Sequence, residues 1–257
     1  MDFKRYWQTT ALTLASIAFC CQTLHAQTSE KNPQTRVLGK LSMIEQPAKD
    51  MEPPEDTIGT GAQSIRPLLP GSPAPTFIVS GMSGSRFAFN PQHLKKPVVI
   101  TFFRGGWCPY CVTQFSGLRE IENELVDLGY EIWFISPDKP EILSFGDPGP
   151  DGNHKIFSDS DLSAARSFGI AYQLEQDTLD RYFGGGRLLA SYSGLDTGRL
   201  PVPSSFIVSK MGEVIFQYSN PDHTRRIDPE LLLTAARLNA KNLASRSLTD
   251  FVDDKTH

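Results

Sequence analysis

Two cysteines, Cys108 and Cys111, follow the apolar run 98–101 and precede a long amphipathic segment. That order predicts a strand, a tight turn and a helix that carries both thiols in its first turn. Cysteines three positions apart on a helix lie on one side of it, close enough to form a disulfide. The partial positive charge of a helix N-terminus favours a thiolate. We therefore expect Cys108 to be an exposed, reactive thiol and Cys111 to resolve the species that it forms.

Such a pair supports two related reactions and leaves one inert reading open. In thiol–disulfide exchange, the Cys108 thiolate attacks a substrate sulfur and Cys111 then releases the mixed disulfide. With a peroxide, Cys108 becomes a sulfenic acid, which condenses with Cys111 to the same Cys108–Cys111 disulfide. The alternative is a static structural bridge, although so short a loop removes little entropy from the unfolded chain. No histidine stands near the pair in sequence, so neither a metal nor another cofactor is expected.

Residues around the thiols have supporting roles with structural alternatives. Pro109 fixes φ at the helix start and removes a backbone donor that would compete for the sulfur. Trp107 is expected to cover the disulfide, or else simply to pack. The candidate charges that would stabilise the thiolate are Arg104, Arg225 and Arg226, and the alternative for each is a solvated surface position.

The elements that must hold the thiols form a strand–helix–strand unit. A stripe of apolar residues from 115 to 128 predicts one helix from about Pro109, with Gly129 as its C-terminal cap. The apolar run 130–136 predicts the next strand. Two consecutive buried strands joined by a helix are parallel, with a right-handed crossover. The cysteines are therefore placed at the carboxyl end of a buried strand.

Further elements extend this unit on both sides. The segments 77–79 and 87–89 predict one hairpin, and 205–208 with 214–218 predict another. A short strand at 155–157 precedes a helix that Asp159 or Ser160 can cap. A last helix begins near Asp228. Residues 171–200 fit none of these elements and are interpreted as an insertion near the thiols.

The start of the chain has the composition of an export signal. Residues 1–26 combine a charged start with an apolar core too short to span a bilayer, which indicates a cleavable signal peptide. Lipidation at Cys20 and an uncleaved membrane anchor are the alternatives. Removal of residues 1–26 would leave only Cys108 and Cys111 of the four cysteines, so the exported protein is not a disulfide-stapled scaffold. We expect an exported protein, located in the periplasm.

The remaining boundaries follow from composition. Residues 27–70 are polar and proline-rich and are predicted to be a flexible tether. Residues 71–242 form the redox domain, which is long enough to bury one core, and residues 243–257 are expected to fray. The formal net charge is −4 without a basic cluster, so no nucleic acid partner is expected.

Four segments together resemble the alkyl hydroperoxide reductase/thiol-specific antioxidant superfamily, in its CxxC-bearing branch. They are residues 71–77, 103–111, 157–169 and 200–208. The resemblance implies an α/β thioredoxin-like fold, with a central mixed β-sheet flanked by helices. It also implies that Pro203 is the cis-proline of that fold, which would offer backbone beside Cys108 to a partner peptide.

One departure from the family pattern concerns peroxide binding. Typical members have a proline seven residues and a threonine or serine three residues before the reactive cysteine, where this chain has Thr101 and Gly105. The hydroxyl that would orient a peroxide is therefore missing. We expect the backbone N–H groups of Gly106 and Trp107, with Arg104 nearby, to bind the oxygen instead.

The activity implied by the resemblance is thiol-dependent reduction of hydroperoxides, with electrons from a thioredoxin-like protein. The first alternative is a thioredoxin- or glutaredoxin-like oxidoreductase that acts on disulfide-bearing proteins, and the second is a redox-inert binding domain. Neither the oligomeric state nor the physiological reductant follows from the sequence.

Overall fold

The computed structural model describes residues 58–147, 149, 152–195 and 197–253, with side chains of the last helix described through Lys241. All of them belong to one compact unit, 47–257. Within the described residues, no helix combines the length and apolar character needed to cross a membrane. The predicted signal peptide and most of the predicted tether lie outside the described residues.

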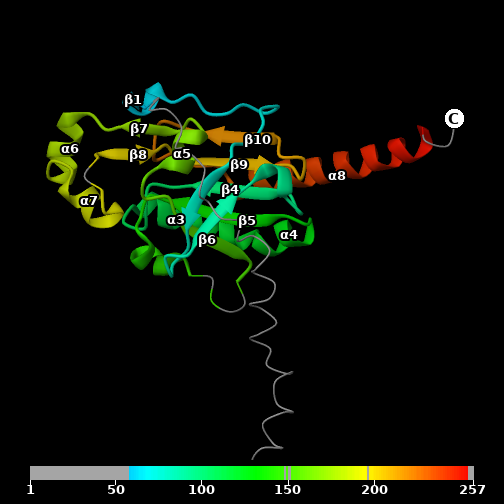
Figure 1. Ribbon diagram of the computed structural model, residues 1–257, viewed down its shortest axis with the longest axis horizontal. Helices are drawn as coiled ribbons and strands as arrows, with labels where there is room; N and C mark the ends of the chain where they lie inside the picture. The colour runs from blue at the N-terminus through cyan, green and yellow to red at the C-terminus, as the bar shows by residue number, and fades with distance from the viewer. Residues whose placement is uncertain (1–57, 148, 150–151, 196, 254–257) are drawn as a thin grey trace, which may run out of the picture. The chain divides into compact units, whose positions relative to one another are not determined.

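A seven-stranded mixed sheet forms the centre of the domain (Figure 1). Its strand order is β10-β9-β4-β5-β6-β2-β3. The strands β4, β5 and β6 run parallel, and every other pairing in this sheet is antiparallel. The predicted mixed sheet and both predicted hairpins are therefore confirmed. The strands are β2 (Phe77–Ser80), β3 (Arg86–Phe89), β4 (Val98–Phe102), β5 (Glu131–Ser136), β6 (His154–Ser158), β9 (Ser204–Val208) and β10 (Val214–Ser219).

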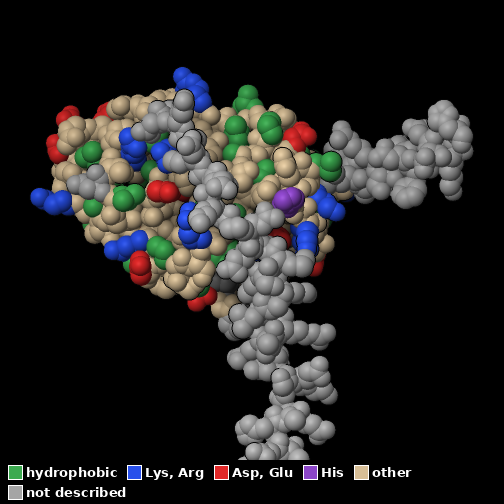
Figure 2. All heavy atoms as spheres, viewed as in Figure 1, with side chains coloured by type: hydrophobic (Ala, Val, Ile, Leu, Met, Phe, Trp, Pro, Cys, Tyr) green, Lys and Arg blue, Asp and Glu red, His purple; other side chains and the backbone are tan. Residues whose placement is uncertain are grey.

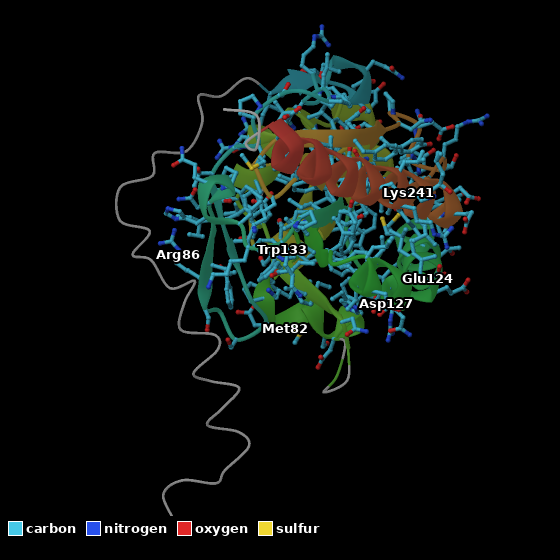
Figure 3. All side chains as sticks on the ribbon, turned by 90° about the vertical axis from the view of Figure 1, so that its right-hand side faces the viewer. Met82, Arg86, Glu124, Asp127, Trp133 and Lys241 are labelled. Carbon is cyan, nitrogen blue, oxygen red and sulfur yellow. The ribbon has the colours of Figure 1, made fainter. Side chains whose placement is uncertain are left out.

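Both faces of this sheet are buried, as the continuous apolar runs of its parallel strands require. On one face Val99, Ile132 and Ile207 pack in one core with the three helices α3, α4 and α8. On the other face Ile100, Trp133 and Phe206 pack in a second core with α5. Figure 3 shows Trp133 in the interior of the domain. The helices are α3 (Pro109–Glu120), α4 (Glu122–Asp127), α5 (Ser163–Ser167) and α8 (Pro229–Asp253).

A second sheet of three strands, in the order β1-β7-β8, is built mostly from the predicted insertion 171–200. The apolar residues of this sheet and of the insertion form a third core of the domain, and the partly buried Trp107 packs against it. The insertion therefore lies beside the thiols, as expected. The small sheet and the insertion together contain β1 (Gly59–Thr60), β7 (Ala171–Gln173), α6 (Gln176–Phe183), α7 (Arg187–Ser193) and β8 (Arg199–Pro201). Short 3-10 turns η1 (Ala62–Ser64), η2 (Pro91–His93) and η3 (Pro140–Gly146) complete the domain.

Three predicted boundaries differ from the structure. The single helix expected after Pro109 is divided at Ile121, whose ψ of 2° is not helical. The domain begins before residue 71, because Arg66 N–H donates to Gly169 O and Leu68 N–H to Phe168 O. The last helix continues to Asp253, past the predicted end of the domain at residue 242. The polar composition of both flanks gave no signal for these features. The N-terminal flank is held by tertiary hydrogen bonds, and the C-terminal flank continues the last helix.

Candidate active site

The two cysteines lie where β4 gives way to α3, as the sequence predicts. Cys108 is the N-cap residue of α3, with extended backbone (φ −94°, ψ 116°), and Pro109 is the first helical residue. Cys111 follows in the first turn, where its N–H donates to Cys108 O at 2.9 Å. Both are free cysteines in this structure, which therefore represents the dithiol form.

The two thiols have opposite acidities. The pKa of Cys108 is lowered from 9.0 to about 5, chiefly because the Cys111 thiol donates a hydrogen bond to its sulfur. Burial opposes this shift, while the Cys111 N–H and the charges of Arg104 and Arg226 support it. The pKa of Cys111 is raised far above its usual range, because its proton is held by Cys108 and because it is buried. The two opposite shifts favour a thiolate at Cys108 and a thiol at Cys111.

Arg226 brings a positive charge to both sulfurs. Its Nη2 lies 3.4 Å from Cys111 Sγ and 3.9 Å from Cys108 Sγ. The guanidinium is fixed by two further bonds, from Nη1 to Gln114 Oε1 at 2.9 Å and from Nε to His223 O at 2.8 Å. A guanidinium held in this way loses little entropy when it stabilises a thiolate. Arg226 therefore belongs to the site rather than to the solvated surface.

The other two candidate arginines are placed differently. Arg104 is only 6% exposed, and its guanidinium lies 5.2 Å from the centre of the Trp107 ring. Its charge contributes to the lowered pKa of Cys108. Arg225 is exposed and pairs with Asp222 at 3.5 Å. The surface alternative is therefore right for Arg225 and wrong for Arg104.

The expectation that Cys108 is exposed is wrong for this structure. Cys108 and Cys111 are each 2% exposed and belong to the core formed by α3, α4 and α8. The partly buried Trp107 packs against that core and is itself held by Phe183 of α6 (ring centres 5.6 Å apart) and Tyr192 of α7 (6.1 Å). The insertion thus supplies a cover that the local motif does not reveal. Trp107 therefore packs between the core that contains the cysteines and the insertion.

The turn before Cys108 is closed by a buried carboxylate. Gly106 N–H donates to Asp138 Oδ2 at 2.7 Å, so this amide is occupied rather than open to a substrate oxygen as expected. Gly105 has a φ of 139°, and a Cβ there would lie 2.3 Å from Trp107 Nε1 and 2.7 Å from Asp138 Oδ1. Only glycine fits this position. A hydroxyl-bearing residue at this position would overlap Trp107 and Asp138 as they stand.

Pro203 does not have the predicted cis geometry, since no peptide bond among the described residues is cis. Between β8 and β9, Val202 N–H donates to Ile170 O at 2.8 Å.

Several residues at the site carry no local signal in the sequence. Gln114 is buried on α3 and accepts from Arg226. His223 packs edge-on against Tyr110, and burial and Arg104 lower its pKa. Asp138 could have been anticipated, because it follows β5 and the carboxyl ends of parallel strands meet at one edge. Among the described residues, no cluster of three or more His, Cys, Asp or Glu side chains could hold a metal ion.

The fold resembles solved peroxiredoxins. The crystal structure of reduced Prx3 in complex with H₂O₂ from Vibrio vulnificus matches with a TM-score of 0.52 and 16% identity, covering 66% of this chain and 96% of that one. Peroxiredoxin 5 from Alvinella pompejana matches with a TM-score of 0.50 and 14% identity, over 66% of this chain and 99% of that one. At such identities the likeness establishes the thioredoxin-type fold alone.

Sequence relatives come from two groups of thiol enzymes. Peroxiredoxin Bcp of Escherichia coli (strain K12) is 30% identical over 106 residues, which cover 41% of this chain and 67% of that protein. Thiol-disulfide oxidoreductase ResA of Bacillus cereus (strain ATCC 10987 / NRS 248) is 25% identical over 146 residues, 56% of this chain and 66% of that protein. The model of the AhpC/TSA family matches residues 70–217, more than half of the chain and all of the segment around the cysteines. The chain belongs to the AhpC/TSA family, and it is a thiol oxidoreductase of the peroxiredoxin-like type.

Proposed function

We propose that this protein is an exported thiol peroxidase that reduces hydroperoxides through a Cys108/Cys111 cycle. The Cys108 thiolate attacks the terminal peroxide oxygen, the O–O bond breaks, and the leaving alkoxide takes a proton to become an alcohol. The Cys108 sulfenic acid then condenses with the Cys111 thiol to a disulfide and water. A thioredoxin-like dithiol returns two electrons and two protons, by thiol–disulfide exchange.

The observation that carries this proposal is the division of acidity between the two sulfurs. A pKa of about 5 makes Cys108 a thiolate at neutral pH, which is the form that attacks peroxide. Cys111 keeps its proton next to that sulfur until Cys108 has been oxidised. This division of acidity supports Cys108 as the attacking thiol and Cys111 as the resolving thiol.

Protein dithiol–disulfide exchange is the second candidate. The similarity to ResA, which spans a longer part of the chain than the similarity to Bcp, supports it. The burial of Cys108 favours the peroxidase, because a small hydroperoxide needs less clearance than a protein disulfide, which must align three sulfur atoms. A static bridge in a binding domain is the third candidate, and it would require a disulfide that resists reduction in the folded protein.

Steady-state assays distinguish these candidates. We expect purified protein without residues 1–26 to consume hydrogen peroxide with dithiothreitol or a thioredoxin as reductant, and Cys108→Ser to abolish the reaction. Cys111→Ser should retain one turnover and lose sustained turnover. Fast insulin reduction without peroxide consumption would replace the peroxidase by the oxidoreductase. A Cys108–Cys111 disulfide that dithiothreitol does not reduce in the folded protein would support the third candidate, a binding domain with a static bridge.

The export signal and the tether are part of the same proposal, and the pattern of residues 1–26 supports them. Cleavage after Ala26 would release a periplasmic protein whose tether begins at Gln27. Mass spectrometry of protein recovered from a periplasmic extract should give a chain that begins at Gln27. An intact N-terminus in the cytoplasmic fraction would contradict this proposal, and a lipid on Cys20 would replace release by anchoring.

Charged side chains of both signs are mixed on the face of the domain that Figure 2 shows. Figure 2 shows Lys and Arg side chains interspersed with Asp and Glu on the face in view. Nucleic acid binding proteins concentrate basic side chains on one face or along one groove. We accordingly propose a hydroperoxide and a thioredoxin-like protein as the partners of the site.

A further inference from the structure

Asp138 is a buried carboxylate that has no role in the proposed cycle. It contacts the turn that precedes Cys108. It is 1% exposed, at the carboxyl end of β5. Its Oδ2 accepts the Gly106 N–H at 2.7 Å, while its buried Oδ1 has no hydrogen-bond partner among the described residues. Its own N–H donates to Ser136 Oγ at 3.2 Å. A buried acceptor without a partner is costly and calls for a physical explanation.

The contacts of Asp138 connect it to the backbone of Cys108. Its Oδ2 fixes Gly106, and Cys108 N–H donates to the carbonyl of the neighbouring Gly105 at 3.2 Å. Oδ1 and Trp107 Nε1 both face the position that a Gly105 Cβ would occupy. One carboxylate therefore holds the whole turn that presents Cys108 at the start of α3.

We infer that Asp138 is a positioning residue for the thiol chemistry, and that its negative charge holds the Gly105–Trp107 turn in the geometry that makes Cys108 reactive. A charge-assisted bond from Gly106 N–H is about twice as strong as a neutral one. Protonation of Asp138 weakens this bond and loosens the turn. This role of Asp138 rests on the proposed function only because that function takes Cys108 as the attacking thiol.

The acidity of Asp138 places this transition in an accessible range. Burial raises its pKa from 3.8 to about 6, against the hydrogen bonds from Gly106 N–H and the Ser136 side chain. Other charged or titratable groups stand on the elements around it. The guanidinium of Arg104 lies over the Trp107 ring. Lys139 follows Asp138 in sequence, and its N–H donates to Tyr192 O. The N–H of Asp159, on the neighbouring strand end, donates to Ser136 O. Burial of the carboxylate sets the direction in which the pKa of Asp138 moves.

The test separates the reactivity of Cys108 from its ionisation. Thiolate is measured by absorbance at 240 nm from pH 4.5 to 8, and the alkylation rate with iodoacetamide is measured over the same range. The rate divided by the thiolate fraction should rise about threefold to tenfold through pH 6 in the wild-type protein. In Asp138→Asn this ratio should not change with pH, because the amide keeps an acceptor oxygen but carries no charge.

Two variants make the result specific. Ser136→Ala should move the rise to higher pH, since it removes a hydrogen bond that favours the charged carboxylate. Glu131→Gln, at the other end of β5, makes the same chemical change where the carboxylate pairs with Lys155 and should leave the rise in place. A ratio that stays flat in the wild-type protein, or an unchanged rise in Asp138→Asn, would overturn the inference. Loss of peroxidase activity with the rise retained would instead overturn the proposed function and leave this inference standing.

Discussion

At the scale of residues, reactivity arises from the contrast between two neighbouring sulfurs. The proton of Cys111 stabilises the Cys108 thiolate more than either arginine does. Stabilising the thiolate also favours the dithiol over the disulfide, which makes the oxidised form a comparatively strong oxidant. The same arrangement that activates Cys108 therefore helps a reductant to regenerate it.

Removing the hydrogen bond between the sulfurs should reduce the acidity of Cys108. We expect Cys111→Ala to raise the pKa of Cys108 from about 5 by roughly two units, since the leading cause of the shift is lost. Arg226→Gln should raise it by a smaller amount, because its charge is a lesser cause. Absorbance at 240 nm against pH measures both.

Arg225→Gln is the matched control, since its side chain is exposed and pairs only with Asp222 among the described contacts. An equal effect of both arginine variants would contradict the assignment of Arg226.

At the scale of elements, three pieces from different parts of the chain build the site. The strand β4 and the helix α3 present the thiols, the loop between β10 and α8 brings Arg226, and the helices α6 and α7 cover Trp107. The loop and its arginine lie outside the region that the family model matches. Part of the lowering of the Cys108 pKa therefore comes from a loop C-terminal to the region that the family model matches.

The cover over the thiols can be loosened from α6. Phe183→Ala should destabilise the domain by about 3 kcal/mol, as removal of a buried aromatic ring does, and should speed alkylation of Cys108 by freeing Trp107. Urea denaturation and iodoacetamide kinetics measure the two effects. Tyr182→Ala is the matched control, because that neighbouring ring is 66% exposed. Unchanged alkylation in Phe183→Ala, with folding retained, would show that α6 does not restrict access.

The cap of α5 is a second element whose contribution can be measured. Asp159 accepts Ala164 N–H at 2.9 Å and Ala165 N–H at 2.8 Å, and it is buried. Asp159→Ala should cost about 1–2 kcal/mol in the free energy of unfolding. Asp161→Ala removes an exposed carboxylate that accepts only the Ser163 N–H among the described bonds, and it should cost less. The reverse order would contradict this assignment of the cap.

Local patterns predicted the elements that local forces determine. The parallel pair β4 and β5, both hairpins and the capping role of Asp159 follow from apolar runs, turns and short polar residues. The break at Ile121, the burial of Cys108 and the contact of Arg226 with the sulfurs could not be predicted in this way. Each depends on packing between segments far apart in sequence, which no local pattern encodes.

At the scale of the whole molecule, two cores on opposite faces of one sheet hold the domain together. Figure 3 shows Arg86 on the β2–β3 hairpin and Glu124 with Asp127 on α4 at different sides of the domain, with Trp133 in its interior. The thiols belong to the core on the helical face that includes α8. Their ionisation is therefore coupled to the stability of the whole domain.

The Cys108 thiolate should make the reduced protein more stable as pH rises, relative to Cys108→Ser. The pKa of Cys108 is about 5 in the folded state and 9.0 by reference, so its stabilising contribution is full above the reference value and lost as pH falls through the folded one. Between pH 6.5 and 8.5 the difference in the free energy of unfolding between the wild-type protein and Cys108→Ser should increase by up to ~1.4 kcal/mol per pH unit. Two buried carboxylates have effects of the opposite sign, because burial raises the pKa of Asp138 to about 6 and that of Asp159 to about 8. Both carboxylates are present in the two proteins, so the difference between the proteins reports on Cys108.

Urea denaturation of the protein in excess reductant at several pH values measures this slope. The variant Cys108→Ser lacks the contribution of the Cys108 thiolate, since serine does not ionise in this range, so its slope should be lower than that of the wild-type protein by this amount. An identical slope in wild type and Cys108→Ser would mean that the folded protein does not stabilise the thiolate.

The most direct measurement is the fate of the two sulfurs after one equivalent of hydrogen peroxide. Mass spectrometry of the reduced protein, quenched after rapid mixing, should find two thiols lost and an intramolecular Cys108–Cys111 disulfide. In Cys111→Ser, dimedone should trap a sulfenic acid on Cys108 alone. Label on Cys111 in Cys108→Ser at a comparable rate, or thiols that remain intact in the wild-type protein, would contradict the assignment of Cys108 as the attacking thiolate.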